Sequence, residues 1–237
     1  MHRGLLAVFL VAALRPLMAQ ERPPAYRVTW SDAASVSAAG ILYVLPVALR
    51  LPHGAPSCAP CDPGTLPSVD RWALGSGSAT GDVASDMILT GVAGFTAFAG
   101  LHGLPAHQWR GNFAVFANAA SWTAASTEWL KVIVHRKRAV LYTAAAVTAA
   151  NDRESQLSFP SLHASLAFAA ATSYLVIARR QHLPHWTRNT ILLYVGALSV
   201  AALRVQSGNH FPTDVLAGAA VGSGIGWLVP MIHSTRP

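Results

Sequence analysis

The chain has 237 residues, of which 17 are Lys or Arg and 10 are Asp or Glu, so only 11% are charged and 52% are hydrophobic. Soluble globular domains average about 25% charged residues. Disorder is excluded, because disordered chains are poor in apolar residues and rich in charge. The net charge of +7 does not indicate a nucleic-acid partner, because the bases are spread thinly and no groove-reading motif accompanies them. We therefore expect a membrane protein with one main domain.

Residues 1–19 have the layout of a secretory signal peptide or of a retained signal anchor, in which His2 and Arg3 precede an apolar run. Both interpretations place residue 20 outside the cytoplasm. Residues 20–83 are then an exported N-terminal segment with a short helix and a loop. Residues 36–51 are helical in pattern, but Pro46 and Arg50 make them too weak to be expected to span a bilayer.

The two cysteines, Cys58 and Cys61, lie in a loop, residues 52–83, that is rich in Pro, Gly and Ser. A zinc site needs four ligands, and only His53 and Asp62 are near enough in sequence to help. A thioredoxin-like redox pair belongs in a βαβ setting, which the sequence pattern does not show. In an exported loop we expect a small structural disulfide.

Five apolar segments after residue 83 are long enough to span a bilayer, which takes about 20 residues. They are rich in small residues that let helices approach closely, and Gly218, Gly222 and Gly226 form a flat packing face. The expected fold is all-α, a transmembrane helical bundle with about five to six membrane helices, and residues 84–237 form its membrane-embedded domain. A further helix over 139–150 is expected at the interface. The five segments are 84–104, 113–134, 161–178, 190–205 and 212–232.

The loops between these segments differ in charge. With residue 20 outside, the inner loops 105–112 and 179–189 and the tail 233–237 contain Arg but no Asp or Glu. Lys and Arg are enriched on the cytoplasmic side of membrane proteins. The signal-like start and the Ala-rich helices favour a bacterial origin. The sequence thus predicts a multi-pass protein of the bacterial inner membrane, with its acidic residues on the periplasmic face.

Two groups of polar residues fall at predicted helix ends on that outer face. Lys131 and Arg138 are seven residues apart, which is two helical turns, so they share a face if the helix continues. Pro160 and Ser161 are residue types favoured at a helix start, and His163 follows them.

The third group joins Arg204 to His210 and Asp214 where the last helix begins. His210 and Asp214 are four residues apart, so the carboxylate can reach an imidazole nitrogen. Three cations, two histidines and a carboxylate on one face describe a pocket for a phosphoryl group. Other polar residues are placed elsewhere. On the inner face we expect four histidines, His102, His107, His182 and His185. Beside the pocket we expect His135 and Lys137. Glu128 is expected to pair with Lys131.

The three groups resemble the signature of the type 2 phosphatidic acid phosphatase family, which shares its helical fold with the vanadium haloperoxidases. That signature reads K-x6-R-P, P-S-G-H and S-R-x5-H-x3-D, and all spacings match across about residues 84–232. Ala139, Leu162 and Leu203 replace the proline, the glycine and the serine of the signature. None of these departures removes a titrating group.

The resemblance implies a role for each site residue. His210 is the nucleophile that forms a phosphohistidine, Asp214 orients it, and His163 is the general acid. The remaining residues bind phosphate, where charge stabilisation dominates phosphoryl transfer. They are Lys131, Arg138, Arg204, Ser161 and the backbone N–H of Leu162.

The implied function is a metal-independent phosphatase of lipid phosphate or pyrophosphate monoesters, without a cofactor. Its partners are then the bilayer and the lipid substrate, with no nucleic acid and no obligatory protein partner. Two alternatives share the fold, namely a soluble secreted acid phosphatase and a vanadium-dependent haloperoxidase. A third, from another class, is a transport or assembly protein with a vestigial site. Five apolar runs disfavour the soluble enzyme, and the intact His163, His210 and Asp214 disfavour a vestigial site.

Overall fold

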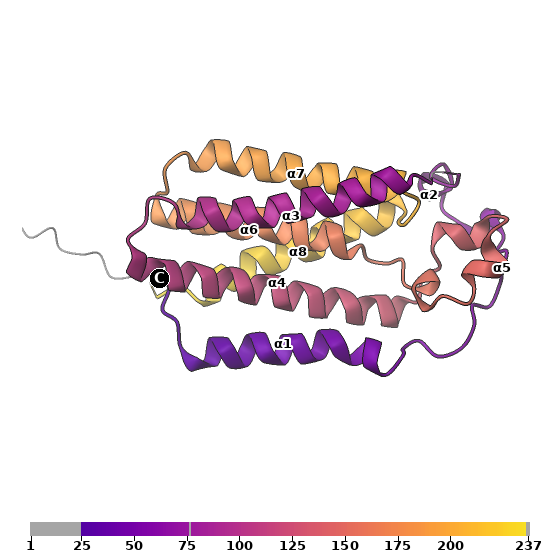
Figure 1. The fold of residues 1–237 in the computed structure, drawn as a ribbon, viewed down its shortest axis with the longest axis horizontal. Helices are drawn as coiled ribbons and strands as arrows, with labels where there is room; N and C mark the ends of the chain where they lie inside the picture. Colours follow the sequence, from indigo (N-terminus) through magenta and orange to yellow (C-terminus); the bar gives the residue numbers. More distant parts are fainter. Residues whose placement is uncertain (1–24, 76, 236–237) are drawn as a thin grey trace, which may run out of the picture.

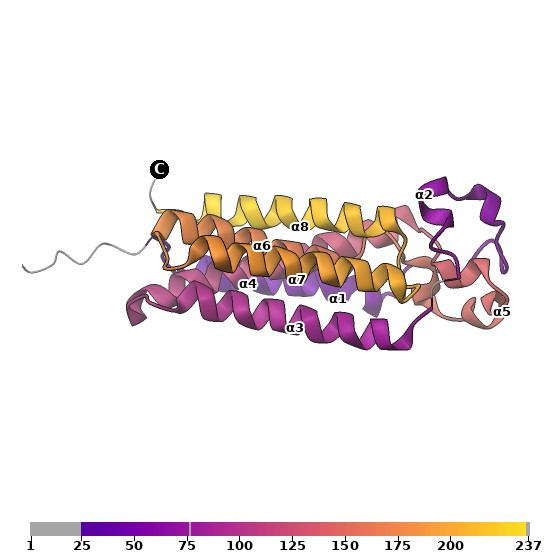
Figure 2. The same ribbon diagram turned by 90° about the horizontal axis from the view of Figure 1, so that it is seen from above.

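The computed structural model describes residues 25–75 and 77–235, within which six long helices run side by side along the long axis (Figure 1 and Figure 2). The predicted signal segment, residues 1–19, lies outside the described residues. The all-α bundle is confirmed. The long helices are α1 (Trp30–Ala48), α3 (Ala79–Leu101), α4 (Ala106–Val134), α6 (Leu162–Gln181), α7 (Trp186–Gln206) and α8 (Pro212–Ile232). The short elements are η1 (Pro63–Thr65), α2 (Ser68–Arg71), η2 (Ala139–Tyr142), α5 (Ala146–Ala149) and η3 (Arg153–Gln156).

Five of the described helices, α1, α3, α6, α7 and α8, are long and apolar enough to cross a membrane, as expected of a multi-pass membrane protein. The expectation that residues 36–51 are too weak to span is wrong. The helix begins earlier, at Trp30, where Asp32 accepts a hydrogen bond from the backbone N–H of Thr29, and it ends before Arg50. The predicted segment 113–134 belongs to the 29-residue α4, which is not among the five.

Helix α6 is the centre of the bundle, in contact with α3, α4, α7 and α8. Its closest neighbour is α8, where the predicted glycine face is confirmed. A Cβ added to Gly222 would lie 2.0 Å from the carbonyl oxygen of Ser165, and one added to Gly218 would lie 2.6 Å from that of Ser161. Small residues therefore bring the N-terminal ends of α6 and α8 together, where the predicted histidines lie.

The two ends of the bundle differ in their contents (Figure 1). One end, which we call the site end, holds α2, α5 and the connection between α7 and α8. The opposite end holds the start of α1, the α3–α4 and α6–α7 connections and the C-terminal segment, where Tyr26 forms a β-bridge with Ser234. The site lies opposite the C-terminal segment, as predicted. The prediction that the start of the N-terminal segment shares the face of the site is wrong for its described residues 25–29, because α1 runs the length of the bundle and only the chain after α1 lies at the site end.

The connections at the site end are more folded than predicted. The twelve-residue helix expected over 139–150 is instead η2 and α5, separated by a turn. The loop expected over 52–83 contains α2, and Cys58 and Cys61 form the predicted disulfide in it. The backbone N–H of Cys61 donates to the carbonyl of Leu141 over 2.7 Å, so the disulfide loop is attached to the segment that follows α4.

Candidate active site

A cavity of about 270 Å³ opens at the site end of the bundle. Six of the eight predicted site residues line it: Lys131, Arg138, Leu162, His163, Arg204 and His210. The other walls come from α1, α4 and η3, through Tyr43, Val47, Glu128 and Glu154. Ser161 and Asp214, the remaining predicted residues, are fully buried next to this cavity at the starts of α6 and α8. The fold thus brings residues from distant parts of the chain to one place.

Lys131 and Arg138 reach the cavity in a way that the sequence did not predict. They do not share a helix face, because α4 ends at Val134 and His135 caps it in the left-handed conformation. The chain then turns, and Arg138 approaches the cavity from the segment before η2. The seven-residue spacing therefore serves a helix end followed by a turn, not a continuous helix.

His210 is held in one orientation by the backbone. Its Nδ1 lies 2.7 Å from the carbonyl oxygen of Ser158, and its side chain is 2% exposed. A carbonyl oxygen only accepts hydrogen bonds, so Nδ1 carries the proton and Nε2 keeps its lone pair. Burial, helped by the charges of Arg138 and Arg204 and opposed by Asp214, lowers the pKa of His210 to about 3. His210 is therefore a neutral imidazole near neutral pH.

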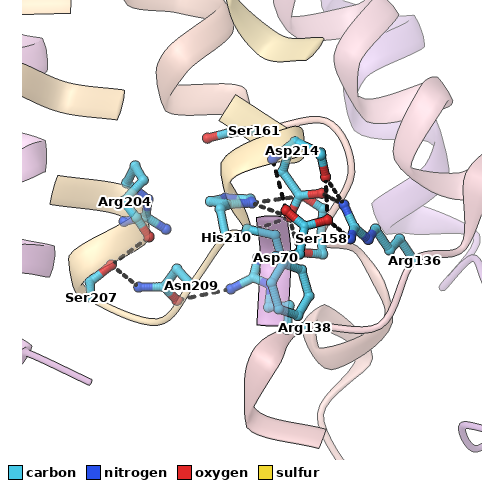
Figure 3. A network of polar contacts seen from close by, with 12 residues as sticks. Asp70, Arg136, Arg138, Ser158, Ser161, Arg204, Ser207, Asn209, His210 and Asp214 are labelled. Carbon is cyan, nitrogen blue, oxygen red and sulfur yellow. Dashed lines mark hydrogen bonds and ion pairs between the residues drawn. The ribbon is translucent and has the colours of Figure 1, made fainter. Parts of the chain in front are cut away.

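Asp214 supports His210 indirectly. The distance from Asp214 Oδ2 to His210 Nδ1 is 3.6 Å, too long for a hydrogen bond. Instead Oδ2 accepts hydrogen bonds from the Ser158 hydroxyl, at 2.5 Å, and from the backbone N–H of Phe211, at 2.8 Å. The carboxylate thus fixes the residue whose carbonyl orients the imidazole (Figure 3).

Arg136, to which the sequence assigned no role, joins two fully buried carboxylates. Its guanidinium forms ion pairs with Asp214 and with Asp70, the latter at 2.7 Å (Figure 3). It also stacks 4.6 Å above the centre of the Phe211 ring. Asp70 also accepts hydrogen bonds from the backbone and hydroxyl of Thr213. Because Asp70 belongs to α2, this network fastens the disulfide-bearing connection to the start of α8.

Each predicted phosphate-binding cation has a carboxylate partner in this structure. Glu128 pairs with Lys131 at 3.5 Å, as predicted, while Arg138 pairs with Glu154 at 2.9 Å. Arg204 pairs with Asp82, and the side-chain amide of Asn209 donates to Asp82 at 2.9 Å. The amide oxygen of Asn209 accepts from the guanidinium of Arg138 at 3.2 Å, which links this pair to Arg138 (Figure 3). The carboxylates of Asp82 and Glu154 are about half exposed, so water can hydrate them when an anion replaces them at the arginines.

Three buried donors around the cavity have no hydrogen-bond partner within the described residues. They are Nε of Arg138, Nε of Arg204 and the hydroxyl of Ser161. A buried polar atom without a partner costs about 1–3 kcal/mol. Arg138 and Arg204 line the cavity, and Ser161 caps α6, whose N-terminus favours anions. An oxyanion is the ligand that would satisfy such donors together.

The second predicted histidine, His163, contacts a carboxylate of α3. Its Nε2 lies 2.7 Å from Oδ1 of Asp86, which is 61% exposed. The sequence offered no signal for Asp86 or Asp82, because both lie in a helix far from the motifs. Asn209 and Arg136 lie within or beside the motifs, and their positions could have drawn attention.

The remaining histidines lie apart from this cavity. His102, His182 and His185 are at the ends of α3, α6 and α7 that are opposite to the site, as predicted for inner loops. His135 is exposed, and neither it nor Lys137 lines the cavity. Across residues 25–75 and 77–235, no cluster of three or more His, Cys, Asp or Glu has the geometry to hold a metal ion.

The sequence also matches a known protein family. The sequence profile of the PAP2 superfamily matches residues 112–237, which include all eight predicted site residues. The chain belongs to the PAP2 superfamily. The family resemblance seen in the motifs is thereby confirmed.

Two kinds of phosphatase are similar to this chain over part of its length. Decaprenylphosphoryl-5-phosphoribose phosphatase from two Mycobacterium tuberculosis strains is 38% identical over 85 residues, 36% of this chain and 42% of the relative. Undecaprenyl-diphosphatase of Sulfolobus acidocaldarius is 38% identical over 80 residues, 34% of this chain and 35% of the relative. The chain thus aligns with less than half the length of these relatives. No solved structure matches the chain significantly.

Proposed function

We propose that this PAP2 protein is a membrane-embedded phosphatase that removes the terminal phosphate from lipid phosphates or diphosphates. The observation that carries the proposal is a buried, neutral His210 with its Nε2 lone pair free, in a cavity lined by three cations and a second histidine. The names of the relatives, a phosphoribose phosphatase and a diphosphatase of polyprenyl lipids, support the same reaction class.

In the proposed mechanism Nε2 of His210 attacks phosphorus, the P–N bond forms and the P–O bond to the leaving group breaks. His163 gives its proton to the leaving oxygen. Water then attacks phosphorus, returns a proton to His163 and breaks the P–N bond, which releases phosphate. The covalent route divides one difficult step into two easier ones. Asp214 contributes by fixing Ser158, whose carbonyl keeps the proton on Nδ1.

The three cations would hold the transferring phosphoryl group. The arginine Nε donors without partners and the Ser161 hydroxyl are available to its oxygens, and Lys131 adds a point charge. The N–H of Leu162, the first residue of α6, adds a donor at a helix N-terminus. Charge stabilisation by such fixed groups is the main source of catalysis in phosphoryl transfer.

A second cavity supports a lipid as the leaving group. This apolar cavity, of about 470 Å³, lies between α3, α4 and α6. Its wall includes Leu166 and Thr90, which are one turn after His163 and Asp86 on their helices. An acyl or prenyl chain in this space would place its oxygen near His163. A phosphatase of water-soluble substrates needs no apolar cavity at this position.

Two observations support an active site outside the cytoplasm. The Cys58–Cys61 disulfide lies at the site end, and disulfides persist in oxidising compartments such as the bacterial periplasm. The opposite end of the described chain carries five Arg and one acid: Arg27, Arg110, Arg179, Arg180, Arg188 and Asp32. We therefore propose a bacterial inner-membrane protein whose site faces the periplasm, which puts Tyr26 on the cytoplasmic side.

Phosphate release from farnesyl monophosphate and farnesyl diphosphate by the purified protein tests the proposal. We expect His210→Gln and His163→Gln to lose nearly all turnover. His107→Gln, an exposed histidine at the opposite end, should retain it. Undiminished turnover in both site variants would refute the mechanism. If the unmodified protein releases phosphate from neither lipid, the proposed function is refuted.

A further inference from the structure

Asp86 is an acidic residue that the proposed mechanism does not use, although it touches the general acid. Its Oδ1 lies 2.7 Å from Nε2 of His163, and His163 is its one ion-pair partner among the described residues. The neighbouring Asp82 differs, because its charge is balanced by Arg204. The direct ion-pair partner of Asp86 therefore carries a positive charge only while His163 is protonated.

The leaving group must lie next to this carboxylate. In the proposed mechanism the leaving oxygen takes its proton from His163, and Asp86 contacts the Nε2 of that ring. We place the leaving oxygen at Nε2, because Nε2 carries the proton that Asp86 accepts, so the leaving oxygen and the carboxylate lie close together. Asp86 is 61% exposed, so solvent screens its charge in part, but a second negative charge placed beside it is still repelled.

We infer that Asp86 makes the site selective for phosphate monoesters over diphosphates. The inference rests on the proposed function and specifies its substrate class. A monoester leaves as a neutral alcohol, whose hydroxyl can donate a hydrogen bond to the carboxylate. The leaving group of a diphosphate is the lipid monophosphate, which carries roughly two negative charges near neutral pH and is repelled by the carboxylate.

Proton delivery acts in the same direction. An alkoxide is a poor leaving group and must take the proton of His163 as the P–O bond breaks. A leaving phosphate is stable as an anion and needs no proton. The hydrogen bond from His163 to Asp86 keeps a proton on Nε2, because a carboxylate only accepts. Asp86 therefore favours monoester cleavage while it hinders diphosphate cleavage.

The test compares farnesyl monophosphate with farnesyl diphosphate, which share one tail, as initial rates of phosphate release. We expect the unmodified protein to have the higher kcat/KM on the monophosphate. Asp86→Asn should shift the ratio of the two kcat/KM values toward the diphosphate by about tenfold or more, through a loss on the monophosphate and a gain on the diphosphate. Asp62→Asn, which removes an exposed charge in the disulfide loop and keeps its capping oxygen, is the matched control.

The outcomes separate the two proposals. A protein that releases phosphate from neither lipid contradicts the proposed function. An active protein that prefers the diphosphate, or an Asp86→Asn variant that loses the same factor on both lipids, overturns the role of Asp86 alone. An equal loss is also what a purely structural role of Asp86 would produce, so the ratio of rates distinguishes selectivity from folding.

Discussion

The contact between α6 and α8 gives a sharp test of how packing controls the site. Substitution of Gly222 by Ala would place a Cβ 2.0 Å from the carbonyl oxygen of Ser165, where real Cβ atoms keep at least 3.0 Å. The helices must then separate locally by at least 1.0 Å, the difference between these two distances. Overpacking of this kind costs about 1–3 kcal/mol, and occasionally more. The higher helix propensity of Ala than of Gly offsets at most about 1 kcal/mol of this cost.

The same displacement reaches the catalytic groups. The starts of α6 and α8 carry His163 and Asp214, and a misplacement of about 1 Å can cost about 100-fold in rate. Gly224→Ala is the matched control, because an added Cβ there meets nothing within 4 Å. We expect Gly222→Ala to unfold at a lower temperature in detergent micelles and to release phosphate far more slowly, while Gly224→Ala matches the unmodified protein. Equal behaviour of the two variants would refute the packing argument.

Three further predictions concern a buried ion pair, the protonation of His210 and the absence of a metal requirement. Arg136→Met leaves Asp70 and Asp214 buried without a cation and should lower the free energy of unfolding, measured by chemical denaturation, by about 3–5 kcal/mol. Adding Asp70→Asn to this variant removes one of the two buried charges and should restore part of that loss. His210 has a pKa lowered to about 3, so the unfolded chain binds its proton first and stability falls as the pH drops from about 6.5 toward 3; melting curves of His210→Gln should show a smaller fall. Phosphate release should persist in the presence of a chelator and be inhibited by vanadate, and loss of turnover on chelation would contradict the metal-independent mechanism.

The sequence predicted most of what depends on local pattern. Apolar segments of bilayer length yielded α3, α6, α7 and α8 to within a few residues, because hydropathy is a one-dimensional property of the chain. The glycines of α8 indicated its packing face for the same reason. The start of α1 was missed because it depends on a cap at Thr29 and Asp32, and this omission put residues 25–29 on the wrong side of the membrane in the prediction.

The parts of the site that the sequence could not predict depend on contacts between distant elements. Asp70, Asp82 and Asp86 carry no motif, and they reach the site because α2 and α3 pack beside α8, α6 and α7. The spacing of His210 and Asp214 indicated a direct contact between them. The actual link runs through Ser158, whose position depends on the turn before α6.

The central claim is that phosphate is transferred to His210, and it can be tested by trapping the phosphoenzyme. Protein turning over phosphate-labelled farnesyl monophosphate would be quenched in alkali, which preserves a P–N bond, and digested for peptide mapping. The mechanism predicts label on the peptide that contains His210 and none in the His210→Gln variant. Label on a different residue, or steady turnover by that variant, would contradict it.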